Sequence, residues 1–325
     1  MSSRDRLESY EKINYLLRPA KQVERKILIE TLHGLAPAGL ALREYAYLGF
    51  GSIYFADFIL FHKLLYIKEM ICVEKSPIPR RMKFNKPYRF VKLWMQRMAD
   101  VIPRLNRKRR YLAWLDYDYG LNEEVLQDIS GLLTVLAPGS ILIVTVDAEP
   151  RLPKDQEDEE LSGTERSDRV FDLFRHLLSR FFENGLKRNQ VTRNALPRTL
   201  AQSLRLHIDT ELARRREIGT KFLQLFNFQY ADGAQMLTVG GIVGDEALER
   251  RVAASGVRNL PFVQHGDEPF RIAVPPLTLR ERHWLERYLE DSTASENIAF
   301  ELEPEVLDHF KRVARHYPHY HEILI

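Results

Sequence analysis

The chain has 325 residues, of which 45% are hydrophobic and 29% charged, so it is long enough to bury a sizeable core. Its 48 Lys and Arg against 45 Asp and Glu leave a net charge of only +3, too little for a whole-protein field that would draw it to nucleic acid; only local patches are left open. The single cysteine, Cys72, excludes an intramolecular disulfide framework and a cysteine-based zinc site, and it fits a reducing compartment.

The polar, charged start of the chain, residues 1–8, does not resemble a signal peptide. Residues 45–67 are apolar and about long enough to span a bilayer, but Asp57 in their middle would cost about 2.5–3.5 kcal/mol there. A buried strand, a tight loop and a buried helix explain the same composition without that cost. We therefore expect a soluble, cytoplasmic protein that makes no contact with a membrane.

Residues 1–44 are predicted to form an N-terminal helical segment. Pro19 suits a first helical turn, and Gly34 lies where the pattern ends. Residues at helical spacing between them are Val23, Ile27, Leu28, Thr31 and Leu32. This pattern favours a helix packed on the following domain over a helix that places Arg18 and Lys21 at the edge of a ligand.

A βαβ unit is predicted to follow within about 30 residues. Residues 45–48 form a short apolar strand, and residues 49–52 form a glycine turn. Residues 53–65 form an apolar helix, and residues 68–74 form a second strand that ends in the acid Glu74. The crossover between two such parallel strands should be right-handed.

Further strands and helices continue the α/β pattern. Residues 90–95 are a weak strand candidate and residues 110–116 a strong one, followed by a helix over 121–136. Residues 140–146 are so rich in branched side chains that we expect a central strand buried on both faces. Two β-rich runs, 222–230 and 235–243, flank Asp232-Gly233, which is a strong signal for a β-hairpin.

The remaining segments are less regular. Residues 149–168 are acidic and polar, with the densest charge at 154–165, and are expected to form a solvated, mobile loop. Residues 169–218 have a helical pattern. The tail combines a short strand at 270–274 with helices at 278–289 and 304–316.

Glycines between a strand and a helix form a recognisable device for binding nucleotides. Gly49 and Gly51 would let the backbone approach a ligand, and the following helix offers free N–H groups at its N-terminus. Glu74, at the end of the next strand, could accept hydrogen bonds from both hydroxyls of a ribose. The spacing therefore predicts a nucleotide-binding loop at residues 48–52.

A terminal hairpin after a parallel βα series resembles the class I S-adenosylmethionine-dependent methyltransferases. The resemblance covers residues 45–146 and 222–243, and it rests on the loop Tyr47–Ser52, on Val73-Glu74 and on the stretch 114–120. The amino-acid sequence of residues 18–148 also resembles that of bacterial proteins described as "putative O-methyltransferases". The resemblance implies an α/β, Rossmann-like methyltransferase fold with a mostly parallel sheet, to which the N-terminal helix, a helical insert and a C-terminal extension are added.

By the same resemblance, the cofactor is S-adenosylmethionine. Its binding residues would be Leu48, Gly49, Phe50, Gly51, Ser52, Asp57, Glu74 and Lys75. The family usually has an acid immediately before the first glycine, and this chain has Leu48 there. We expect Asp57 or Asp116 to supply the missing carboxylate for the amino group of the cofactor.

Asp116 and Asp118 flank Tyr117 at the end of the predicted fourth strand. One of them could orient the acceptor or act as a general base, or the pair could hold a metal together with Asp147; alternatively, both cap the following turn and helix. We expect no metal. The stretch lacks the Asn/Asp-Pro-Pro-Tyr/Trp motif of methyltransferases that act on adenine amino groups, which argues against that reaction.

Three further clusters have an ordinary structural explanation. His316, His319 and His321 have spacings that could suit a metal, but an ordered aromatic tail packed on the core is favoured. The basic runs 104–110 and 214–216 are typical of solvated loops. Because the first run precedes the fourth strand, away from the predicted cofactor, the sequence favours a small molecule or a protein over nucleic acid as acceptor.

We thus divide the chain into residues 1–44, a methyltransferase-like core at 45–148 and 219–245, an acidic loop and helical insert at 149–218, and an extension at 246–325 packed on the core. The leading hypothesis is O-methyl transfer from S-adenosylmethionine to an unidentified acceptor. The alternative is an inactive methyltransferase-like protein that binds a nucleotide or acts as a scaffold, with a partner or a second copy bound through 150–218. An NAD-dependent oxidoreductase would leave the hairpin unexplained.

Overall fold

The computed structural model describes residues 18–75, 78–153, 156, 162–215, 219–289 and 298–319. The strands are β1 Ala46–Phe50, β2 Glu69–Val73, β3 Val91–Trp94, β4 Tyr111–Gly120, β5 Ile141–Asp147, β6 Lys221–Asp232, β7 Ala234–Gly244 and β8 Phe270–Ile272. The α-helices are α2 Pro19–His33, α3 Ala56–Leu65, α4 Pro79–Asn85, α5 Met98–Val101, α6 Glu123–Val135, α7 Gly163–Leu178, α8 Leu196–Ala213, α9 Glu246–Ala254, α10 Leu279–Arg287 and α11 Pro304–Val313.

All eight strands join one sheet in the order β3-β2-β1-β4-β5-β7-β6-β8. Strands β1 to β5 pair in parallel, whereas β7 is antiparallel to both β5 and β6, and β8 pairs in parallel with β6. This is the Rossmann-like methyltransferase fold, a mostly parallel sheet that ends in an antiparallel hairpin. The fold class expected from the sequence is confirmed, and β8 adds a strand beyond the hairpin.

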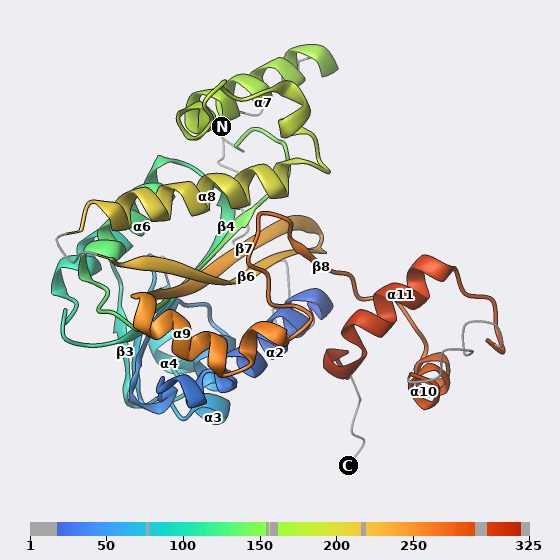
Figure 1. The fold of residues 1–325 in the computed structure, drawn as a ribbon, viewed down its shortest axis with the longest axis horizontal. Coiled ribbons are helices and arrows are strands. Elements are labelled where there is room, and N and C mark those ends of the chain that lie inside the picture. The colour runs from blue at the N-terminus through green and yellow to red at the C-terminus, as the bar shows by residue number, and fades with distance from the viewer. Residues whose placement is uncertain are drawn as a thin grey trace.

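Helices cover both faces of this sheet, because alternate side chains of each strand enter two separate apolar clusters. In β1, Tyr47 belongs to the cluster beneath α2, α3 and α9, while Leu48 belongs to the cluster beneath α5, α6 and α8. Every residue of β5 is buried, as its branched composition predicts. Figure 1 shows α2, α3 and α9 on one side of the sheet and α6 and α8 on the other.

A side-chain cap and a left-handed residue set where two of the core helices begin. Asn122 caps α6, its side chain accepting a hydrogen bond from the amide of Val125. Helix α3 begins at Ala56, three residues later than predicted, because Phe55 adopts a left-handed conformation with φ 46°. A buried, non-glycine residue in that region is strained, and it lies in the loop after β1 where the sequence predicts ligand binding.

The hairpin of β6 and β7 turns at Gly233, whose φ of 106° favours glycine. Asp232, beside it, has a second role. Its carboxylate accepts hydrogen bonds from the backbone amides of Ala20 (3.0 Å) and Lys21 (2.9 Å), in the first turn of α2. The turn thus caps a helix more than 200 residues away in sequence and fixes α2 across the end of the sheet.

The predicted insert at 149–218 contains two different helices. Helix α8 packs on β6, β7 and α6, and so belongs to the layer that covers the sheet, whereas α7 lies beyond it (Figure 1). Most of the acidic run, including residues 157–161, lies outside the described residues. How the chain divides into domains stays a proposal, with α8 assigned to the core.

The C-terminal segments reach back to the core. Helix α9, which the sequence did not predict, is capped by Asp245 and buries Leu248 and Val252. His316 is buried, with Nε2 at 2.5 Å from Glu30 of α2, as expected of a packed tail; His321 lies outside the described residues. Among the described residues, no three side chains are grouped to hold a metal, and no helix is long and apolar enough to cross a membrane.

Candidate functional site

The carboxyl ends of parallel strands β1, β2 and β4 bring three predicted site residues into one row. Gly49 pairs with Cys72 of β2 and with Trp114 of β4. Two residues further along, Gly51 and Glu74 follow the ends of β1 and β2, and Asp116 lies in β4. The same register, continued past these ends, brings the three residues into one row, with neighbouring strands about 4.8 Å apart. We call this edge, with the loop that follows β1, the carboxyl edge; ligands of open α/β sheets bind there.

The two glycines of the predicted loop are required by close packing. A Cβ at Gly49 would lie 2.4 Å from the hydroxyl of Tyr47, and a Cβ at Gly51 would lie 2.3 Å from the sulfur of Cys72. The amide of Gly51 donates to the carbonyl of Val73 at 3.2 Å, so the loop stays paired with β2 beyond the end of β1. Glycine thus keeps this backbone tight against its neighbours, where another residue would push it outward.

Glu74 lies half-buried just after β2. Its amide donates to the carbonyl of Trp94, at the end of β3, at 3.1 Å, and its Oε1 accepts from the amide of Lys75 at 2.9 Å. The adjacent ends of β1 and β3 carry the half-buried rings of Phe50 and Trp94. Both rings are level with Val73 and pack with the cluster beneath α5, α6 and α8. The carboxylate of Glu74, at the end of the strand between them, has the chemistry to hold a ribose.

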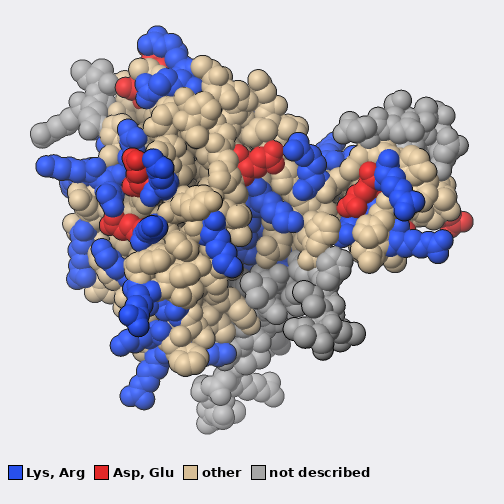
Figure 2. Space-filling model, turned by 90° about the horizontal axis from the view of Figure 1, so that it is seen from below, with Lys and Arg blue, Asp and Glu red and all other residues tan. Residues whose placement is uncertain are grey.

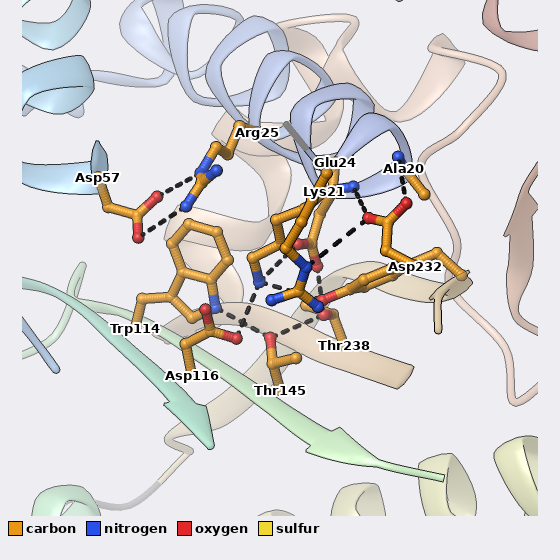
Figure 3. Close-up of polar contacts among 12 residues, drawn as sticks. Ala20, Lys21, Glu24, Arg25, Asp57, Trp114, Asp116, Thr145, Asp232 and Thr238 are labelled. Carbon is orange, nitrogen blue, oxygen red and sulfur yellow. Dashed lines mark hydrogen bonds and ion pairs between the residues drawn. The ribbon is translucent and has the colours of Figure 1, made fainter. Parts of the chain in front are cut away.

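Asp116 is bound by a lysine from the N-terminal helix (Figure 3). Nζ of Lys21 lies 2.8 Å from Asp116, 2.8 Å from Glu24 and 3.1 Å from the hydroxyl of Tyr230, and 4.4 Å above the ring of Trp114. Lys21 and Glu24 are buried, whereas the side chain of Asp116 remains 27% exposed. Asp116 is therefore held from the protein side and stays accessible from the solvent side.

Two buried threonines continue this network into the sheet. Nε1 of Trp114 donates to the hydroxyl of Thr145 at 2.9 Å. The hydroxyl of Thr145 lies 2.7 Å from the hydroxyl of Thr238, which in turn donates to Glu24. The chain of contacts runs from β4 through β5 to β7 and ends on α2 (Figure 3). Such satisfied polar networks fix the relative positions of the elements that contribute to them.

Charge balance explains how these groups tolerate burial. Burial by itself lowers the pKa of Lys21, but the carboxylates of Asp116 and Glu24 outweigh it, and the pKa lies well above its usual value. Burial raises the pKa of Glu24, while the charge of Lys21 opposes the shift. Lys21 therefore stays positively charged and neutralises the carboxylates around it.

A second ion pair joins α2 to the first turn of α3. Nε of Arg25 lies 2.6 Å from Asp57, and a further nitrogen of the same guanidinium donates to Asp57 at 3.3 Å. Burial would raise the pKa of Asp57, but the charge and hydrogen bonds of Arg25 more than offset this, so that the pKa is lowered. The predicted ligand of the cofactor amino group is therefore ionised and already bound by a side chain of the protein.

The other predicted acids occupy different surroundings. Asp118 is exposed on the last part of β4. Asp147, at the end of β5, is buried and ion-paired with Arg151, and its Oδ1 accepts from the amide of Glu149 at 2.7 Å. Capping of α6 falls to Asn122, so Asp116 and Asp118 are not the caps that the alternative interpretation required.

Between these acids, Tyr117 points to the opposite face of the sheet. Its hydroxyl donates to Asp128 of α6 at 2.8 Å, and its ring lies 4.9 Å from that of Phe50. Burial, with the charge of Glu124, raises the pKa of Asp128 to about 6, although the bond from Tyr117 opposes the shift. The contacts of Tyr117 with Asp128 and Phe50 thus fix the end of β4 on the face of the sheet opposite Asp116.

The sequence analysis named Lys21 at the edge of a ligand only as the less favoured alternative, and it missed the parts that Glu24 and Arg25 of α2 play. Lys21, Glu24 and Arg25 share a helix face with Leu28, at spacings of three, four and seven residues, and all four are buried. Three charged residues on the helix face that is predicted to be buried indicate either that the wrong face was predicted or that the face contains a polar site. This pattern of charges was the signal in the sequence that could have revealed the site.

The residues of the carboxyl edge fit S-adenosylmethionine in part. Glu74, half-buried at the carboxyl edge, has a carboxylate that suits a ribose. Asp57 does not fit its predicted role as it stands, because Arg25 occupies it. The ribose of the cofactor therefore has a suitable partner here, and the amino group of its methionine half has Asp116 as the remaining partially exposed carboxylate.

Comparison with solved structures gives distant matches. One is an N-methyltransferase, NodS, from Bradyrhizobium japonicum WM9, at 12% identity over 67% of this chain and 98% of that chain, with a TM-score of 0.33. Another is M. jannaschii TYW2 in complex with AdoMet, at 14% identity over 72% and 79%, with a TM-score of 0.37. A third is described as a putative sarcosine dimethylglycine methyltransferase from Galdieria sulphuraria, at 13% identity over 89% and 78%, with a TM-score of 0.35.

Sequence comparison is more decisive. No curated protein is similar enough to match the chain. A protein family does match, over residues 13–325, and therefore over nearly the whole chain. That span includes α2, the carboxyl edge, the hairpin and the C-terminal helices. The chain belongs to this family, whose description is "Putative O-methyltransferase".

Proposed function

We propose that the protein is an S-adenosylmethionine-dependent O-methyltransferase whose cofactor binds at the carboxyl edge. The observation that carries the proposal is the row formed by Gly51, Glu74 and Asp116 on three neighbouring parallel strands. The family and the terminal hairpin of the sheet support it.

In this proposal each part of the edge has a distinct task. The carboxylate of Glu74 accepts hydrogen bonds from the ribose hydroxyls, and Leu48 to Ser52, with Lys75, shape the backbone around the nucleoside. When bound, the cofactor supplies an activated methyl group. The protein then contributes mainly by positioning donor and acceptor, which can account for a large part of the rate.

Asp116 and Asp118 are our candidates for the groups that face the acceptor. Lys21 fixes the position of Asp116, so this carboxylate can orient an acceptor hydroxyl or the amino group of the cofactor without being free to swing away. Asp118 is exposed two residues further along the strand and could accept the proton released by an acceptor hydroxyl. In this proposal the acceptor is a molecule with a hydroxyl group that receives the methyl group.

A labelled-methyl transfer assay tests this function. Purified protein is incubated with S-adenosylmethionine carrying a labelled methyl group and with cell extract separated into small molecules, RNA and protein. We expect label to enter one fraction, to fall at least tenfold with Glu74→Ala, and to persist with Glu44→Ala, an exposed glutamate before the amino end of β1. Absence of label from all fractions would reject the enzyme hypothesis.

One observation favours a second candidate function, an inactive protein that binds a nucleotide or acts as a scaffold. Side chains of α2 already bind both Asp57 and Asp116, so these two carboxylates are engaged by the protein itself and not by a cofactor. In that case the protein would bind S-adenosylhomocysteine but transfer no methyl group. Its partner, or a second copy, would bind through residues 150–218.

A further inference from the structure

Positive charge is concentrated in one segment of the chain. Residues 63–110 contain fifteen Lys and Arg against three Asp and Glu, whereas the whole chain has a net charge of only +3. The rest of the chain is therefore net negative. All but one of these fifteen basic residues are exposed, the exception being the half-buried Lys86.

The fold gathers this charge on one side of the molecule. The segment spans the end of α3, strand β2, helix α4 and β3, which is the edge strand of the sheet. In Figure 2, Lys and Arg predominate over Asp and Glu on the left of the view; in Figure 1, α3, α4 and β3 lie on that side, together with α9. We call the exposed surface of residues 63–110, of which 76 and 77 lie outside the described residues, the basic strip.

Contacts within the segment join its two ends. Lys92 of β3 and Arg109, from the loop before β4, both reach Glu69 at the start of β2. The run at 104–110 is therefore continuous with the edge strand. At the opposite end, Lys75 follows Glu74 directly, and the exposed Arg97 follows β3. The basic strip thus extends from the amino end of the strands to the carboxyl edge, where the cofactor is proposed to bind.

An exposed aromatic ring lies within the strip. Phe84 of α4 is 88% exposed, and its neighbours in sequence include Arg81 and the exposed Lys83. Single exposed apolar rings are common on protein surfaces, so the relevant feature is the combination of this ring with the positive charge around it. Bases of a single strand stack on such rings while Lys and Arg bind the phosphates.

We propose that the basic strip binds single-stranded nucleic acid, with phosphates along residues 63–110 and a base stacked on Phe84. An anionic membrane is a poorer match, because interfacial binding requires a broad apolar helix face and α4 has only seven residues. The proposal does not depend on methyl transfer, since binding to the strip requires no cofactor. It also shows how a polyanion could reach the carboxyl edge despite the position of the run at 104–110.

Fluorescence anisotropy with labelled 20-nucleotide single strands, as RNA and as DNA of the same sequence, tests the proposal. The charge variant is Lys83→Glu/Arg89→Glu/Lys108→Glu, three exposed residues of the strip. The matched control reverses three exposed basic residues of the C-terminal helices, Arg280→Glu/Arg287→Glu/Lys311→Glu. Far-UV circular dichroism checks that all variants are folded.

We expect wild type and control to bind, and the strip variant to bind at least tenfold more weakly. Its plot of log affinity against log salt should also be shallower by about 2, because three phosphate contacts are lost at about 0.7 each. Equal weakening in both variants, or no binding of either oligonucleotide by wild type in 50 mM salt, would overturn the proposal. Binding to vesicles containing phosphatidylserine but not to oligonucleotides would identify the strip as a membrane surface.

Phe84 permits a test that charge alone cannot mimic. Phe84→Ala should weaken binding several-fold with an unchanged salt slope, because the stacking contact carries no charge. Phe84→Trp should restore the affinity. Because the ring is 88% exposed, neither change should affect folding. If Phe84→Ala bound the strand as tightly as wild type, the proposed stacking of a base on Phe84 would be wrong.

Discussion

Lys21 is the residue on which the arrangement of the site depends most. It is buried, and its ammonium group lies 2.8 Å from each of two carboxylates, on Glu24 and Asp116. Removing one partner of a buried ion pair leaves an uncompensated charge, which is far more costly than the net contribution of the pair. Glu24 would be that charge, because it is fully buried whereas Asp116 is in contact with solvent.

We therefore expect Lys21→Met to lower the free energy of unfolding by about 3–5 kcal/mol near neutral pH. The loss should be smaller in Lys21→Met/Glu24→Gln, which removes the stranded charge. Urea denaturation followed by circular dichroism measures both, and Lys63→Met, at an exposed site, is the control, with an expected change within about 0.5 kcal/mol. A single variant as stable as the control would show that the ion pairs of Lys21 do not hold α2 in place.

Asp128 gives the stability a predictable dependence on pH. Its pKa of about 6 lies above the value of about 3.9 for an unfolded chain. The folded protein therefore holds the proton more tightly, and this stabilisation is full below pH 4 and is lost as the pH rises through 6. Asp128→Asn removes the ionisation and keeps an acceptor for the hydroxyl of Tyr117.

At pH 8 we expect Asp128→Asn to be more stable than wild type by up to about 3 kcal/mol, and the difference should vanish near pH 4. Thermal unfolding across that range is the measurement. Asp118→Asn, an exposed position on β4, the strand that carries Tyr117, should unfold like wild type at each pH. If Asp128→Asn were instead less stable than wild type at pH 8, the charged carboxylate would be the form that the fold prefers.

At the scale of elements, helix α2 links the hairpin to the carboxyl edge. Its first turn is capped by Asp232 from the hairpin, and its next turn carries Lys21 and Arg25 to Asp116 and Asp57. The hairpin that identifies the fold therefore also sets the position of the charges at the site. An uncapped helix start would allow this first turn to fray.

Asp232→Ala should accordingly cost about 1–2 kcal/mol and raise hydrogen exchange at the amides of Ala20 and Lys21. The matched control is Asp245→Ala, which removes the cap that α9 receives at Leu248. It should cost a similar amount without raising exchange in α2. Equal protection of α2 in the two variants would contradict the role of the hairpin.

Patterns local in sequence predicted most elements well. The βαβ unit, the buried central strand and the hairpin around Asp232-Gly233 all follow from period, composition and turn chemistry, and they are present. Features that depend on distant contacts were missed. The αL conformation of Phe55 delays α3, and the salt bridges of Lys21 and Arg25 reach partners 95 and 32 residues away. No local pattern encodes such pairings.

At the scale of the whole molecule, the sheet places two features beside each other. The carboxyl edge carries the row of Gly51, Glu74 and Asp116, and the basic strip runs along the β3 side of the same sheet. The near-zero net charge of the chain conceals this separation, because acidic residues elsewhere balance the strip. Only the order of the strands shows that the two are neighbours.

Binding of the cofactor at the carboxyl edge is the central claim, and isothermal titration calorimetry tests it most directly. S-adenosylmethionine and S-adenosylhomocysteine are each titrated into wild type, Glu74→Ala and Glu69→Ala. Glu69 lies at the opposite end of β2 and serves as the matched control. We predict binding of both ligands to wild type and to Glu69→Ala, and at least tenfold weaker binding to Glu74→Ala. No heat of binding in wild type, or equal affinities in the two variants, would contradict the account.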